Sequence, residues 1–562
     1  MKFSEMTYAR PDMDNLKAVA EQTVAKLEQA ESVQQQLDAY YTFEKAAKTA
    51  ETMGTIAYIR HSIDTRDGFY EQEQDWLDSV MPQMEEQKQQ VSMALLRSPF
   101  RKELEEALGS LLFANLEIAV RSFKPELMEL MAEENKLASD YQKLYASAMV
   151  EFDGKTMPLP MLGPYKLSTD RAVRKAAYEV EGRFFDSHQA ELDEIYDKLV
   201  KNRTAQGKLM GYENYLPLGY DRLGRNCYGP EKVAAFREQV AQKLVPMLQQ
   251  VKENQRKRLG LPELYLYDDA MRFADGNAKP SGTADDILKA GLEMYHSLSP
   301  ETAEFIDFMY DNELLDVLSK DGKAPGGYCI SLPDYQAPFI FSNFNGTAGD
   351  VDVLTHEAGH AFADYRASRK GYVRDLQSPT IEACECHSMS MEFLTQDYHK
   401  NFFGEDTRKY EIAHCEDALM FLPYGCLVDE FQHRVYEEPE MTPARRNELW
   451  LELEKKYRPW MDFEDLPFYS RGAGWQRQLH IFQVPLYYID YCMAQTVAFQ
   501  FWIASMEDRE DAWKRYLAFT DKGGTCTFEQ LVHGAGLKVP YEEGCIAQVC
   551  GAIRRWLEEN SL

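Results

Sequence analysis

Residues 355–362 of the chain read THEAGHAF, which places His356 and His360 four residues apart with Glu357 beside the first. On an α-helix, residues four apart share one face, so both imidazoles can reach one tetrahedral Zn²⁺ ion. Asp350 offers a capping group at the start of such a helix. The stretch therefore predicts a helix that presents two histidines to a metal ion, with a glutamate next to them.

A β-hairpin is predicted just upstream. The strand-like runs 328–332 (YCISL) and 337–343 (APFIFSN) flank the turn residues 333–336. Pro338 cannot donate to a ladder, so we expect its strand at the edge of the sheet, where an extended peptide can pair. A purely structural hairpin is the alternative.

The rest of the chain reads as helical. Apolar residues recur at three- and four-residue spacing, which is typical of amphipathic helices. A break rich in Pro and Gly at 156–165 and a mixed region after 258 interrupt this pattern. The helical stretches are 14–90, 99–149, 170–207, 230–258 and much of 351–562.

Composition limits the function classes. The 562 residues include 62 Lys+Arg and 92 Asp+Glu, a net charge of −30, and 44% are hydrophobic. Such a chain can bury a core, while its charge disfavours nucleic acid and anionic membrane surfaces as partners. The charged N-terminus and the lack of a long apolar run predict a cytoplasmic protein. The ten cysteines form no C-x-x-C pair, so we expect reduced thiols.

The third metal ligand is expected on a second helix. Ser378, Pro379 and Thr380 form a helix start. The residues that follow include three glutamates, Glu382, Glu385 and Glu392. Catalytic zinc usually takes three protein ligands and one water, so a carboxylate here would complete the set. An ordinary solvated acidic face is the alternative.

The motif and its spacing resemble a known family. After His360 come 24 intervening residues and then Glu385, within the pattern E-x-x-S-x-x-x-E that Ser388 and Glu392 complete. This arrangement resembles the oligoendopeptidase F and thimet oligopeptidase family of zinc metallopeptidases, with oligoendopeptidase F the closer match. The resemblance is best over residues 200–550.

The resemblance implies roles for the motif residues. It makes His356, His360 and Glu385 the ligands of one Zn²⁺ per chain, with Glu382 as the fallback third ligand. It makes Glu357 the general base that activates the water. Ser388 and Glu392 are then expected to orient the ligands, and His387, two residues beyond Glu385, is expected to point away from the metal.

Further groups are expected to act on the substrate. The segment 480–491 resembles the family segment in which a histidine precedes tyrosines, so His480, Tyr488 and Tyr491 are candidate donors to the developing oxyanion. Tyr487 competes with these tyrosines, and a tyrosine-rich helix can also be plain core. The substrate-binding candidates are Gly326, Gly327, Tyr328 and Phe339. For the two glycines, a plain tight turn is the alternative.

The overall prediction is a mainly α zincin. Residues 1–195 form an N-terminal helical region over a catalytic region at 196–562, with a small hairpin beside the active-site helix and a deep channel. The resemblance implies an oligoendopeptidase that hydrolyses internal bonds of short, unstructured peptides. A zinc metallocarboxypeptidase or peptidyl-dipeptidase is one alternative, and a non-catalytic helical zinc- or peptide-binding protein is another. The oligomeric state is left open.

Overall fold

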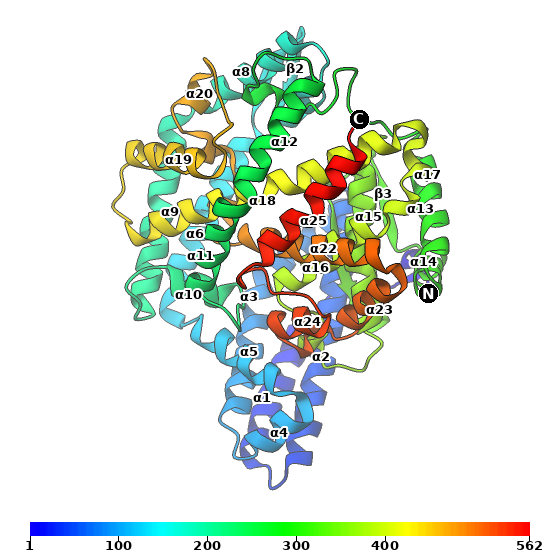
Figure 1. Ribbon diagram of the computed structural model, residues 1–562. Coiled ribbons are helices and arrows are strands. Elements are labelled where there is room, and N and C mark those ends of the chain that lie inside the picture. The colour runs from blue at the N-terminus through cyan, green and yellow to red at the C-terminus, as the bar shows by residue number, and fades with distance from the viewer. The chain divides into compact units, whose positions relative to one another are not determined.

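The computed structural model describes all 562 residues and is mainly helical, with five short strands in two small sheets (Figure 1). The predicted fold class is thereby confirmed. The chain divides into two compact units, each assembled from three segments. The first unit comprises Met1–Val120, Lys279–Thr407 and Val497–Leu537, and the second comprises Arg121–Ala278, Arg408–Thr496 and Lys538–Leu562.

The first unit begins with a helical bundle. Asp12 Oδ1 accepts a hydrogen bond from the Asn15 N–H at 2.9 Å and caps the first helix. The apolar stripes of the helices meet in one core, which includes Leu16, Phe43 and Phe113. The elements of this unit are α1 (Met13–Gln29), α2 (Val33–Ile63), α3 (Gly68–Leu96), α4 (Arg101–Leu108), α5 (Ser110–Arg121), α13 (Ala284–Leu298), α14 (Pro300–Asp311), β3 (Leu315–Leu318), β4 (Tyr328–Leu332), β5 (Ala337–Phe344), α15 (Ala348–Ala367), α16 (Ile381–Leu394), α17 (Lys400–Phe403), α23 (Arg509–Thr520) and α24 (Phe528–Gly534).

The second unit carries a similar number of helices and one hairpin. Its elements are α6 (Met128–Ala146), β1 (Met149–Phe152), β2 (Lys155–Pro158), α7 (Gly163–Lys166), α8 (Arg171–Ser187), α9 (Gln189–Leu209), α10 (Leu216–Arg222), α11 (Pro230–Gln239), α12 (Val245–Arg258), α18 (Thr407–Glu437), α19 (Pro443–Tyr457), α20 (Pro467–Ser470), α21 (Leu479–Gln483) and α25 (Cys545–Asn560). One helix, α22 (Ile489–Glu507), is divided between the units, since its residues up to Thr496 belong to the second and those from Val497 to the first. Residue 195, the expected boundary between two regions, lies within α9, and that boundary stays a prediction. None of the helices has both the length and the apolar composition needed to cross a bilayer.

The hairpin before α15 has the predicted strands, with Tyr328 opposite Phe341 and Leu332 opposite Ala337. The expectation that the Pro338 strand lies at the edge is wrong. The strand order is β3-β5-β4, so β5 is central and β4 is the edge strand. The parallel pairing of β3 with β5 starts at Ile340, so Pro338 lies beyond the end of β3 and its missing N–H removes no ladder bond.

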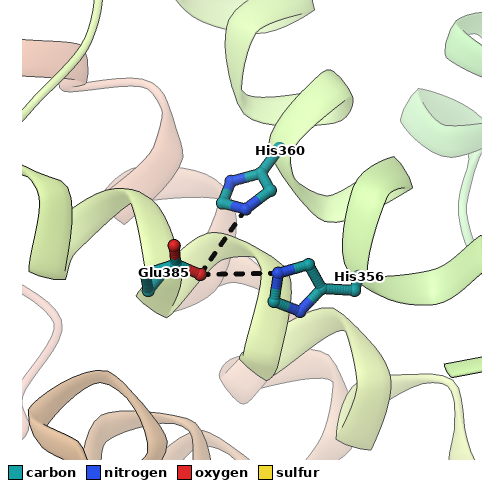
Figure 2. Close-up of side chains that lie close together, drawn as sticks. All are labelled: His356, His360 and Glu385. Atoms are coloured by element: carbon teal, nitrogen blue, oxygen red, sulfur yellow. Dashed lines mark ion pairs between the residues drawn. The ribbon is translucent and has the colours of Figure 1, made fainter. Parts of the chain in front are cut away.

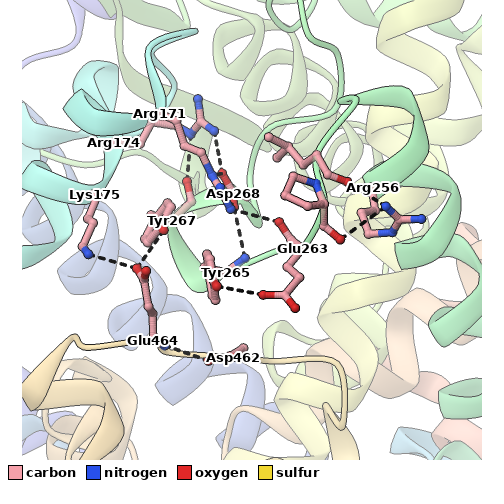
Figure 3. A network of polar contacts seen from close by, with 12 residues as sticks. Arg171, Arg174, Lys175, Arg256, Glu263, Tyr265, Tyr267, Asp268, Asp462 and Glu464 are labelled. Atoms are coloured by element: carbon pink, nitrogen blue, oxygen red, sulfur yellow. Dashed lines mark hydrogen bonds and ion pairs between the residues drawn. The ribbon is translucent and has the colours of Figure 1, made fainter.

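A polar network in the second unit fastens the irregular segment after α12 to α8 (Figure 3). Asp268 is fully buried and accepts from Arg171 Nη2 and from Arg174 Nη2, each at 2.6 Å. Arg174 Nε also donates to the Tyr267 carbonyl at 2.9 Å. The buried carboxylate is thus paired with two guanidinium groups, as a charge in the interior must be.

Candidate metal centre

The helix with the H-E-x-x-H motif starts at a well-formed cap. Asp350 Oδ2 accepts from the backbone N–H groups of Asn345 at 2.9 Å and Gly346 at 2.6 Å. These bonds fix the turn between β5 and α15, as the capping residue predicts. The helix therefore enters directly from the central strand of the sheet, which sets the direction in which its histidines point.

Close packing of α15 on α16 brings the third carboxylate to the histidines. Gly359, inside the motif, lies so near α16 that a Cβ atom built on it would be 2.6 Å from the Ser388 Cα and 2.8 Å from the His387 carbonyl oxygen. Only a glycine fits at that approach. Gly359 is a residue that the metal-ligand spacing does not single out, although a glycine within a helix motif is a signal of close contact.

His356, His360 and Glu385 form one cluster whose ligand atoms all lie within 4.8 Å of one another. Glu385 Oε2 is 3.4 Å from His356 Nε2 and 3.6 Å from His360 Nε2 (Figure 2). Around a tetrahedral zinc with ligands at about 2.0–2.1 Å, neighbouring donor atoms are about 3.3–3.5 Å apart. The spacing and chemistry of this donor set therefore fit a zinc ion.

Two further residues of α16 hold these side chains in place. Glu392 Oε1 lies 2.8 Å from His356 Nδ1, which leaves Nε2 of that imidazole facing Glu385. Ser388 Oγ donates to Glu385 Oε2 at 3.3 Å. Contacts of this kind fix the ring orientation and raise the basicity of a ligand. Glu392 and Ser388 therefore each contact one side chain of the cluster that would hold the metal ion.

The carboxyl groups of Glu385 and Glu357 differ in how readily they ionise. Burial opposes ionisation of Glu385, but hydrogen bonds from His356 and His360 outweigh it and lower the pKa of that carboxyl group. Burial raises the pKa of Glu357 above its ordinary value, and the two imidazoles oppose the rise. Glu385 therefore favours its ionised form beside the two imidazoles, while Glu357 has the stronger tendency to take up a proton.

Two neighbours on α16 lie outside the cluster. Glu382 is fully buried, and Thr380 Oγ1 donates to its Oε1 at 2.7 Å. The His387 ring is buried and packs edge-on against Phe519, with centroids 5.4 Å apart. The structure therefore brings Glu385, and neither Glu382 nor His387, to the two histidines.

The side chains of Tyr328 and Phe339 lie on the face of the sheet that points away from α15. Ser331 Oγ is 3.1 Å from Asp364 Oδ2 of α15, so odd-numbered residues of β4 face the helix. Tyr328 instead stacks on Phe341 at 4.8 Å, and Phe339 packs on Phe3 at 4.6 Å. Neither ring therefore joins the metal cluster, because side chains alternate along a strand.

Gly326 and Gly327 lead into the free edge strand β4. Gly326 has φ +95°, a conformation that a residue with a side chain rarely adopts. The Asn343 side-chain amide donates to the carbonyls of Ala324 and Gly326, at 2.8 and 2.9 Å. These two hydrogen bonds from β5 therefore fix the conformation of the loop that precedes the edge strand.

The His480 segment lies in the second unit. His480 contacts Tyr488, with ring centroids 4.8 Å apart, and Tyr491 at 6.1 Å. Gln478 Nε2 lies 2.9 Å from His480 Nδ1, and Tyr424 donates to the Oε1 atom of the same amide at 2.6 Å. The amide therefore donates to Nδ1 and leaves Nε2 as the N–H donor. Burial lowers the pKa of His480, which favours this neutral form.

A helical fold with an H-E-x-x-H helix and a glutamate on the next helix defines a class of metallopeptidases. Comparison with known proteins identifies the family. Residues 3–123 match the Peptidase M3 N-terminal domain, and residues 165–549 match Peptidase family M3. The chain belongs to Peptidase family M3, and it is a hydrolase of the metalloendopeptidase type.

Individual relatives support the assignment to this family. An oligoendopeptidase F homolog of Lactococcus lactis subsp. lactis is 22% identical over 448 residues, which are 74% of this chain and 71% of the relative. The solved structure of PZ peptidase A with inhibitor 2 is 47% identical, with a TM-score of 0.93 over 99% of both chains. A putative oligoendopeptidase F from Bacillus anthracis str. Ames is 42% identical, with a TM-score of 0.89 over 100% of this chain and 99% of that one.

Proposed function

We propose that the chain is a zinc-dependent oligoendopeptidase that holds one Zn²⁺ through His356, His360 and Glu385. The single observation that supports it most is the donor set itself, with Glu385 Oε2 at 3.4 and 3.6 Å from two imidazole nitrogens. A zinc ion bound there supplies a water of lowered pKa as nucleophile and polarises the substrate carbonyl.

Glu357 acts as the general base. It lies next to His356 on the metal-binding turn of α15, and its burial favours proton uptake. In this proposal Glu357 takes the proton of the attacking water and delivers it to the leaving nitrogen, so that the amine departs neutral. Ser388 and Glu392 keep Glu385 and His356 in position while this happens.

His480, Tyr488 and Tyr491 donate to the oxyanion. Hydrolysis of an amide places negative charge on the carbonyl oxygen, and donors already oriented toward it lower the barrier. The N–H at His480 Nε2 is available because Gln478 occupies Nδ1. Either tyrosine can supply the second hydrogen bond, and the choice among Tyr488, Tyr491 and Tyr487 is part of the proposal to be tested.

The substrates are short, unstructured peptides. The relatives are oligoendopeptidases by name, and the free edge of β4 offers backbone groups to an extended chain. Gly326 and Gly327 contribute a loop without side chains at the start of that edge, whereas Tyr328 and Phe339 support the strands from the opposite face.

The test is mass spectrometry of the products from a mixed peptide library, with and without a chelator. We expect internal cuts in short peptides, equal cutting of peptides with blocked termini, no cutting of folded proteins, and loss of all cutting with the chelator. A carboxypeptidase or peptidyl-dipeptidase needs the free terminal carboxylate, so it would spare peptides with a blocked C-terminus. Zinc binding without any product would instead identify a non-catalytic binding protein.

A further inference from the structure

The segment that carries His480 and the tyrosines contains one strained residue. Leu486, in the loop between α21 and α22, has φ +67° although it is not a glycine. A bulky side chain in the left-handed region persists only where its surroundings enforce it, and such residues cluster at functional sites. Leu486 is fully buried, so what enforces this conformation can be identified in the packing around it.

Arg225 and Gln432 hold both polar groups of the Leu486 backbone. Arg225 Nη2 donates to the Leu486 carbonyl and to Asp490 Oδ1, each at 2.7 Å. Gln432 Oε1 accepts from the Leu486 N–H at 3.0 Å. The side chains of Arg225 and Asp490 are both fully buried. The guanidinium group therefore ties the loop to the first turn of α22, on which Tyr491 lies.

The leucine side chain is fixed as well. A Cβ atom built on Gly219 would lie 2.7 Å from Leu486 Cδ1, so α10 leaves room for the leucine only because residue 219 is a glycine. The side chain cannot rotate freely in that slot, and the backbone cannot relax without leaving two buried polar groups unpaired. One conformation of the loop is therefore strongly preferred.

A second buried arginine holds the other end of the segment. Arg203 donates from Nη2 to the Phe482 carbonyl at 2.5 Å and from Nη1 to the Ile481 carbonyl at 3.2 Å. Its Nε donates to Glu134 Oε1 at 2.6 Å. The segment 481–490 is thus held at both ends by cations that water does not reach.

We infer that Arg225 is a positioning residue for hydrolysis: with Arg203 it locks residues 481–490 so that His480, Tyr488 and Tyr491 present their donors in one fixed array. The inference rests on the proposed role of these three residues. Nη2 is the nitrogen of Arg225 that has hydrogen-bond partners, and Nε and Nη1 have none, so losing the Leu486 carbonyl would leave the buried guanidinium bonded to Asp490 alone. Loop conformations that displace the tyrosines are therefore rare. Donors fixed before the reaction need no reorganisation in the transition state.

The test compares Arg225→Lys with a matched control. Lysine keeps the charge opposite Asp490, but its side chain is one bond shorter, so its ammonium group does not reach the position of Nη2, the atom that bonds both acceptors. Arg174→Lys removes a similar buried bridge in the same unit, between the Tyr267 carbonyl and Asp268 (Figure 3), and none of the groups to which Arg174 donates belongs to residues 481–490. We expect both variants to lose thermal stability, but only Arg225→Lys to lower kcat, by about 10–100-fold with KM nearly unchanged.

A double-mutant cycle separates positioning from general destabilisation. If Arg225 acts through the tyrosines, Arg225→Lys should lower kcat much less in the Tyr488→Phe or the Tyr491→Phe background than in the parent chain. If Arg225→Lys does not fold, Gln432→Leu takes its place in the cycle. Of the contacts to this loop, that substitution removes only the acceptor of the Leu486 N–H.

Two results would overturn the inference. If the tyrosine and His480 variants lose activity while Arg225→Lys behaves like Arg174→Lys, the positioning role is wrong and the proposed donors stand. If His480→Ala, Tyr488→Phe and Tyr491→Phe all keep the parent kcat, the proposed donors are wrong, and the positioning role falls with them.

Discussion

Gly359→Ala is the substitution that tests how the cluster of His356, His360 and Glu385 is built. The new Cβ would lie 2.6 Å from the Ser388 Cα and 2.8 Å from the His387 carbonyl oxygen. Carbon atoms are in favourable contact at about 3.5–4.0 Å, so α16 would have to move away from α15 by about 0.9 Å. Both obstructing atoms belong to the backbone, so no side-chain rotation can relieve the contact.

The movement would act directly on the ligands, because Glu385 lies on the helix that must shift. Its Oε2 atom is 3.4 and 3.6 Å from the two imidazole nitrogens, and a shift of about 0.9 Å exceeds the tolerance of about 0.2 Å in a zinc site. We expect zinc affinity to fall by more than about tenfold. Overpacking should lower the free energy of unfolding by about 1–3 kcal/mol, offset by about 1 kcal/mol of helix propensity.

The assay is zinc affinity by chelator competition, together with thermal unfolding and peptide hydrolysis. Gly54→Ala is the matched control, since a Cβ at that position in α2 would meet only Leu77 Cδ2, at an ordinary 3.7 Å. It should leave zinc binding unchanged and raise stability slightly. Parent zinc affinity and activity in Gly359→Ala would refute the claim that this close contact sets the ligand geometry.

Three further predictions concern single groups. Glu385→Ala should lose bound zinc whereas Glu382→Ala should keep it, as metal analysis after dialysis would show; the reverse result would make Glu382 the ligand. Glu392→Ala should weaken zinc binding by about 10–100-fold, because His356 loses the partner at 2.8 Å, and an unchanged dissociation constant would contradict this. Burial lowers the pKa of His480 in the folded chain. Its contribution to the free energy of unfolding is therefore fully present above the ordinary histidine pKa, and it is lost as the pH falls from that value through the lowered pKa of the folded state. An NMR titration of the His480 ring should therefore give a pKa below about 6.5, and a value at or above it would rule out the neutral donor.

The local elements of the proposed metal centre could be predicted from the sequence. The hairpin at 328–343 and the helix that contains His356 follow from patterns that are local in the chain, namely turn residues, capping groups and four-residue spacing. Glu385 could be selected over Glu382 only through the family resemblance, because both lie on the same helix. The structure separates them by which one faces α15.

What could not be predicted depends on contacts between distant segments. Pro338 suggested an edge strand, yet β5 is the central strand, and β3 pairs with it only from Ile340 onward. The direction in which Tyr328 points follows from strand alternation only once Ser331 is known to contact α15. The arginines that hold the His480 segment come from residues more than 250 positions away in sequence, where no local pattern marks them.

The most direct test of the central claim is zinc content and peptide hydrolysis measured on the same sample of Glu357→Gln. The three proposed ligands remain in this variant, so it should bind one zinc per chain. Without its general base it should lose hydrolysis by a factor of about 100 or more. Full activity in the zinc-loaded variant would contradict the mechanism proposed for this chain.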